Sequence, residues 1–199
     1  MHKTSHTALL AALMIVPATI GWTVPADTLT LQPESKLWVV GTSTARGFEC
    51  EATSLTVDVA AAPGAVALIA SGEKGVTNVG VRIPTAQLDC RNGTMNKHML
   101  KALKATEHPE IAFDLASYEL ATVDEGIAVT LTGDLTLGGK RKTITVLANA
   151  APIEGDALKV TGVHDVLLSD YGLKAPKLML GTMKVHDLVK VHFDLLLKE

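Results

Sequence analysis

The sequence predicts an all-β fold, mainly antiparallel, with about eight strands and one amphipathic helix near residues 94–105. Most of the chain alternates apolar and polar residues with a period of two, so one face of each strand meets an apolar interior and the other meets water. Residues 91–113 interrupt this alternation, because the apolar spacing there becomes that of a helix. No internal repeat or linker divides the chain, which indicates one domain after the N-terminal segment.

The first 26 residues have the features of a cleavable secretory signal peptide. Lys3 precedes the apolar run ALLAALMIVPATI, and Val24 and Ala26 occupy the −3 and −1 positions of a cleavage site. The apolar run has about 13 residues, fewer than a transmembrane helix needs. We therefore expect residues 1–26 to be removed and residues 27–199 to act as a periplasmic or secreted domain.

The strand pattern is clearest in GIAVTLTGDLTLGG, where Ile127, Val129, Leu131, Leu135 and Leu137 share one face. Gly, Asn, Asp or Pro bounds most of the other runs. These segments fit either a closed antiparallel barrel or a two-layer sandwich, and closure has the advantage of removing exposed edges. The segments are 28–32, 37–41, 54–60, 76–84, 110–120, 126–139, 142–148, 157–168 and 187–199.

The helical segment has an apolar stripe that includes Met95, Met99 and Leu103, with lysines on or near the opposite side. Thr94 is the expected N-cap, and Pro109 ends the segment. Two interpretations stay open. The helix seals the end of a barrel core, or it is a Met-rich lid over a binding cavity. The lysines are interpreted as solvated, with transient contact to an anionic membrane surface as the alternative.

The composition argues against several classes of function. The formal net charge is −3 and the chain has no basic stripe with interleaved aromatic residues, so we expect no nucleic-acid partner. No Gly-x-Ser-x-Gly motif, phosphate loop or zinc-hydrolase histidine pair occurs. We therefore predict no catalytic residues, no metal site and no enzyme activity.

The two cysteines, Cys50 and Cys90, are an even pair in a chain expected to reach an oxidising compartment. Such a pair favours a disulfide, which would close a loop of about 40 residues. Two free buried thiols and a metal-binding pair are the alternatives.

Several segments are distinctive when they are taken together in their order and spacing: LWVVGTSTARGFEC, the helix, HPEIAF, VTLTGDLTLGGKRKTITV, LSDYGL and VHDLVKVHFDL. They resemble the YceI family of exported bacterial proteins, which have a lipocalin-like barrel and bind polyisoprenoids. The resemblance runs from about residue 28 to residue 197. One departure is that the helix keeps His98 but lacks the Arg-Asp pair common in the family, and another is Leu168 where the family usually has an Arg.

The resemblance implies an eight-stranded lipocalin-like barrel that carries a polyisoprenoid or an isoprenoid quinone and needs no other cofactor. His98 is a candidate for a hydrogen bond to a quinone or phosphate headgroup, with a simply solvated helix histidine as the alternative. His164 is interpreted as an inward histidine satisfied by a neighbour. The alternative function is an exported protein–protein docking or stress-related module with a filled barrel; a homodimer fits either function. The candidate ligand-binding residues are Trp38, Val40, Phe48, Val81, Ile83, Met95, His98, Met99, Leu103, Phe113, Leu115, Val129, Leu131, Ile144, Val146, Val160, Val191 and Phe193.

Overall fold

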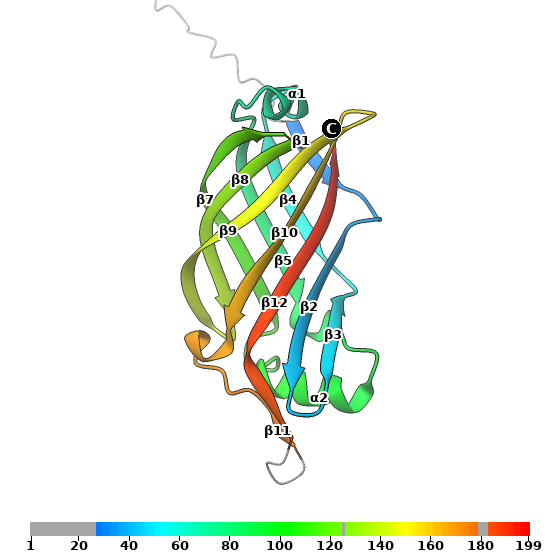
Figure 1. The fold of residues 1–199 in the computed structure, drawn as a ribbon, viewed down its shortest axis with the longest axis vertical. Helices are drawn as coiled ribbons and strands as arrows, with labels where there is room; N and C mark the ends of the chain where they lie inside the picture. The colour runs from blue at the N-terminus through cyan, green and yellow to red at the C-terminus, as the bar shows by residue number, and fades with distance from the viewer. Residues whose placement is uncertain (1–26, 125, 179–182) are drawn as a thin grey trace, which may run out of the picture.

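The structure, a computed structural model, describes residues 27–124, 126–178 and 183–199. Within these residues the strands wind into an elongated barrel with a short α-helix at each end (Figure 1). The expected signal peptide, residues 1–26, lies outside the described residues.

Eight strands of the described chain form a closed circuit of antiparallel pairs, in the order β1, β4, β5, β7, β8, β9, β10 and β12. β12 then pairs with β1 and closes the ring. The predicted eight-stranded antiparallel barrel is therefore confirmed. The strands are β1 (Asp27–Leu31), β4 (Thr56–Ala61), β5 (Val76–Pro84), β7 (Glu110–Val123), β8 (Gly126–Leu137), β9 (Lys140–Ile153), β10 (Ala157–Leu167) and β12 (Met183–Lys198).

Further strands extend the wall toward one end. The C-terminal end of β12 pairs with β1, whereas Val185 and residues 189–194 of β12 pair with β2 (Lys36–Ser43). β2 pairs with β3 (Gly47–Ala52), which pairs with β6 (Leu88–Asp89) after the 3-10 turn η1 (Thr85–Gln87). β11 (Lys177–Leu178) pairs with the start of β12. β3, β6 and β11 are strands in addition to the nine predicted segments, and two of them have two residues each, too few to show an alternation.

The barrel wall has a seam between β9 and β10. The pairing of these strands covers Ala157–Gly162 of β10 and stops before His164. The 3-10 turn η2 (Leu168–Tyr171) follows β10 directly and buries Leu168 and Tyr171. An ion pair of 2.8 Å between Lys142 Nζ and Asp170 Oδ2 joins this turn to β9. A side-chain ion pair of η2 thus connects the turn to β9 beyond the end of the β9–β10 backbone pairing.

Two α-helices occur in the described chain, so the expectation of one helix is incomplete. α2 (Gly93–Ala102) is the predicted helix, but Asn92 is its N-cap and accepts a hydrogen bond from the Met95 amide at 3.0 Å, so the assignment of Thr94 is wrong. α1 (Ala65–Ala70) was not predicted, because the six apolar residues AVALIA have no helical period.

Candidate functional site

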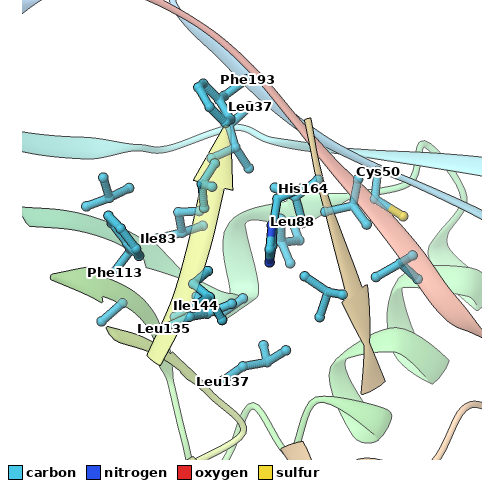
Figure 2. Close-up of a pocket in the computed structure, with 18 of the residues that line it drawn as sticks. Leu37, Cys50, Ile83, Leu88, Phe113, Leu135, Leu137, Ile144, His164 and Phe193 are labelled. Atoms are coloured by element: carbon cyan, nitrogen blue, oxygen red, sulfur yellow. The ribbon is translucent and has the colours of Figure 1, made fainter. Parts of the chain in front are cut away.

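A cavity of about 630 Å³ occupies the barrel interior. Its wall reaches from Ile69 of α1 to Met95 and His98 of α2, so it extends from one end of the barrel toward the other. The lining is almost entirely apolar, as Figure 2 shows for part of the wall. Volumes of this size and chemistry are typical of pockets that enclose a small hydrophobic ligand.

Glycines on the inner face help to keep the interior open. The chain has three phenylalanines, and each ring lies against an inward glycine of a neighbouring strand. Phe48 covers Gly41, Phe113 covers Gly133 and Phe193 covers Gly162, so closely that a Cβ at any of these glycines would overlap the ring. Because the rings fold onto the wall, they contribute apolar surface without filling the cavity.

Sixteen of the eighteen predicted site residues line this cavity, and their role in binding a ligand stays a prediction. They come from seven strands and the α2 segment, so the barrel brings together residues far apart in the chain. The sixteen are Phe48, Val81, Ile83, Met95, His98, Met99, Leu103, Phe113, Leu115, Val129, Leu131, Ile144, Val146, Val160, Val191 and Phe193.

The prediction of an inward Trp38 and Val40 is wrong. Trp38 pairs with His192 of β12, and the two rings stack on the outer face with centroids 5.1 Å apart. Leu37 and Val39 line the cavity instead. The segment LWVV is apolar on both faces, so its alternation does not fix the register, and a slip of one residue exchanges the faces.

Two other parts of the cavity lining were not predicted from the sequence. In β7 the pairing shifts between Leu115 and Ser117, which is a β-bulge, and the inward face changes from Phe113 and Leu115 to Tyr118 and Leu120. At the far end, Ile69 of α1 contributes to the lining. A period-two pattern does not reveal where a β-bulge occurs. An apolar run as short as α1 does not indicate which of its residues face the cavity.

The predicted disulfide between Cys50 and Cys90 is present. It joins β3 to the residues that lead into α2. Asn96 of α2 also returns to this hinge, because its Oδ1 accepts from the Cys90 amide at 2.8 Å and its Nδ2 donates to Asp89 Oδ1 at 2.7 Å. The Asn96 hydrogen bond, with that from the Arg91 amide, lowers the pKa of the Asp89 carboxyl, which favours the charged acceptor. The start of α2 is thus fixed.

The rest of α2 is held more loosely. No residue within the helix is fully buried, and its apolar contacts to the barrel come from partly buried Met99 and from Leu103 just after it. Met95, His98 and Met99 face the cavity, whereas Lys97 and Lys101 are exposed. The helix therefore covers the cavity without a core of its own.

Polar residues gather where the cavity reaches the surface. Ser43 and Arg46 come from the β2–β3 turn, and Asn92, Thr94 and His98 come from the α2 segment. We call this region the mouth. A smaller polar hollow of about 300 Å³ adjoins it and includes Arg46, Glu49 and Arg91. The Arg91 guanidinium pairs with Glu51 Oε2 at 3.2 Å, so opposite charges are mixed here.

His164 is the polar group that stands apart from the mouth. Its side chain lines the cavity between Val160 and Val166 of β10, and Figure 2 shows the ring among apolar side chains. Burial lowers the pKa of this imidazole, and the nearby Asp165 opposes the shift. Among the described residues neither ring nitrogen has a hydrogen-bond partner, so the expected satisfying neighbour is not there.

The described residues contain no group of three or more His, Cys, Asp or Glu side chains placed to hold a metal ion. Over the same residues, neither α-helix has the length and hydrophobicity of a membrane span.

Comparison with known proteins agrees with this architecture. Residues 22–197 match the YceI-like domain. The chain belongs to this family. A search of curated proteins found no match.

Solved structures of the YceI-like fold superpose on most of the chain. Burkholderia cenocepacia BcnA has a TM-score of 0.65 at 22% identity and covers 82% of this chain and 96% of its own. A Saccharophagus degradans domain described as polyisoprenoid-binding has a TM-score of 0.59 at 13% identity, covering 86% and 97%. The Campylobacter jejuni YceI protein has a TM-score of 0.57 at 15% identity, covering 92% and 93%. At these identities the similarity establishes the fold.

Proposed function

We propose that this YceI-like protein is an exported carrier that holds an isoprenoid lipid inside its barrel. The observation that carries the proposal is the apolar cavity of about 630 Å³, which runs from α1 to the mouth. The polyisoprenoid-binding domain of Saccharophagus degradans, which shares the fold, supports the same ligand class. The N-terminal segment, read as a signal peptide, supports export to the periplasm or beyond.

The physical case rests on the insolubility of a prenyl chain in water. Each methylene transferred from water to the cavity contributes about 0.8 kcal/mol, so a few isoprene units supply a useful affinity without any catalytic group. The described wall consists mainly of Val, Leu and Ile side chains, and among these described residues no charged group lies away from the mouth. Such a wall binds the hydrocarbon strongly and tolerates differences in its length.

In this proposal α2 acts as a lid. Its N-terminal end is tied to β3 by the disulfide, while the helix itself buries no residue completely. Opening therefore costs little apolar burial, and Met95 and Met99 adapt to ligands of different shape. The exposed lysines at positions 97, 101 and 104 are available for transient contact with an anionic membrane during loading.

The alternative of a docking module with a filled barrel requires side chains to occupy the interior. The cavity argues against it, because close packing leaves few voids larger than a water molecule in an ordinary core.

The first test is native mass spectrometry of the mature protein purified from the periplasm, followed by solvent extraction of the bound material. We expect an added mass that extracts as a prenyl lipid. A bare mass that stays unchanged after incubation with isoprenoid quinones and polyprenyl phosphates would contradict the proposal.

A pair of variants tests whether the ligand lies in the barrel. Val160→Trp places a large ring in the cavity, whereas Val163→Trp on the same strand places it on the outer face, where Val163 is 47% exposed. We expect Val160→Trp to reduce lipid loading at least tenfold and Val163→Trp to leave it unchanged, with thermal melts reporting that both variants fold. Equal loading of the two variants would place the ligand elsewhere.

A further inference from the structure

His164 combines three properties that no other residue of the described cavity wall shares. It projects into the cavity away from the mouth, it is ionisable, and neither of its ring nitrogens has a hydrogen-bond partner among the described residues. Tyr118 also lines the cavity, but its hydroxyl donates to the Val76 carbonyl at 3.1 Å and accepts from the Val76 amide at 3.0 Å. The hydrogen-bonding capacity of Tyr118 is therefore used, and that of His164 is not.

The strand register fixes the position of His164 in the barrel. It pairs with Val191 of β12, Val191 pairs with Val39 of β2, and Val39 pairs with Cys50 of β3. These four residues all line the cavity and form one row across the wall. His164 lies three residues before the end of β10, about 10 Å along the strand at 3.3 Å per residue. A ligand group at His164 would thus sit inside the barrel, in its α2 half.

The charge of the surroundings restricts what such a group can be. Val191 and the other wall residues beside His164 are apolar, Arg46 and His98 lie at the mouth, and Asp165 points to the outer face, where it pairs with Lys190 at 2.7 Å. A neutral imidazole offers one donor and one acceptor but no positive charge. A phosphate placed here would be a buried anion without a counter-charge, which is very unfavourable. A hydroxyl or carbonyl oxygen meets no such penalty.

We propose that His164 is the internal polar anchor of the cavity and selects an isoprenoid lipid with an uncharged oxygen headgroup, an alcohol or a quinone carbonyl. This inference rests on the proposed carrier function and specifies its ligand class. The hydrocarbon tail then extends along the apolar wall, and the polar residues of the mouth are not needed for headgroup recognition.

The test compares three ligands that share one prenyl chain: geranylgeraniol, its monophosphate and the corresponding hydrocarbon. Dissociation constants are measured by displacement of a neutral fluorescent probe from the wild-type protein, His164→Leu and His164→Gln. We expect the wild type to bind the alcohol about three- to tenfold tighter than the hydrocarbon, the net effect of one neutral hydrogen bond. His164→Leu should abolish this preference, and His164→Gln, which keeps a donor and an acceptor, should retain most of it.

His192→Leu is the matched control, because it makes the same substitution on the outer face of the neighbouring strand. Its alcohol preference should equal that of the wild type. If His164→Leu does not fold, NMR of the His164 ring nitrogens in the wild-type protein provides the readout, and binding of the alcohol should shift them more than binding of the hydrocarbon.

Other outcomes overturn the inference in distinguishable ways. An alcohol preference that persists in His164→Leu, or no preference in the wild type, excludes His164 as the anchor. Tightest binding of the monophosphate, lost in Arg46→Gln and kept in His164→Leu, would place a charged headgroup at the mouth. Failure of the wild type to bind all three ligands would instead reject the carrier function itself.

Discussion

The two ends of the barrel are closed by helices that are stabilised in opposite ways. α1 has no side-chain cap, since its N-cap is Gly64, yet it buries Ala65, Val66 and Ile69 in the core. α2 is longer and has a side-chain cap from Asn92, yet no residue within it is fully buried. Packing holds the first helix, whereas local hydrogen bonds and a disulfide hold the second.

This difference assigns separate roles to the two ends. Ile69 packs in a cluster with Leu29, Val59 and Leu158, and the Val66 amide donates to Glu199 Oε1 at 3.0 Å, so α1 is integrated with the first and last strands. Moving α1 would expose this core. Moving α2 would expose little beyond Met99 and Leu103. The α1 end is therefore the more firmly packed floor of the cavity, and the opening proposed above would lie at the α2 end.

The largest effect is expected from removal of the disulfide. The double variant Cys50→Ala/Cys90→Ala should lose about 4 kcal/mol of unfolding free energy, from the entropy of a loop with 40 residues of separation. Urea denaturation without reductant measures it. Lipid retention should also fall, because the hinge of α2 is no longer tied to β3. Unchanged stability and retention would mean that Asn96 alone fixes the hinge.

Two side-chain truncations, one in each helix, compare α1 and α2 directly. Ile69→Ala should destabilise the fold by about 3 kcal/mol, because it leaves a void in the buried cluster at the floor. Met99→Ala should cost about 1 kcal/mol, since Met99 is only partly buried. Urea melts of both variants provide the comparison. Equal losses would contradict the distinction between floor and lid.

Loss of the α2 cap should act locally. Asn92→Ala removes the acceptor of the Met95 amide and should weaken the helix by about 1 kcal/mol. We expect faster hydrogen exchange of α2 amides and faster lipid exchange, with little change in exchange of α1 amides. Lys97→Ala, an exposed substitution in the same helix, serves as the control. An equal loss of hydrogen-exchange protection in both helices would show that α2 unfolds only with the whole domain.

The smallest effect concerns pH and His164. Its folded pKa is lowered from 6.5 by burial, so the unfolded state takes up the proton more readily. The stability that this neutral group provides is present above pH 6.5 and is lost as the pH falls through the lower folded pKa. The melting temperature of His164→Leu should therefore fall less on acidification than that of the wild type. His192→Leu serves as the control. Parallel melting curves would show that His164 does not titrate in this way.

Much of the barrel was predictable because a strand's alternation is local information. All nine predicted segments lie mainly within strands, and the inward faces of β8 and β12 are those that the pattern gives. The disulfide followed from the number of cysteines and the expected compartment. The errors arose where the pattern is ambiguous: both faces of β2 are apolar, and the bulge after Leu115 shifts the alternation in β7.

The sequence by itself determined the strands, most inward residues and the helix α2, since each depends on residues close together in the chain. The tertiary structure decided whether the interior is open. That depends on the summed volume of side chains from all strands and on three phenylalanine rings that lie over glycines of neighbouring strands. It also decided that His164 faces the cavity without a hydrogen-bond partner among the described residues, because hydrogen-bonding satisfaction depends on residues that only the closed barrel brings near.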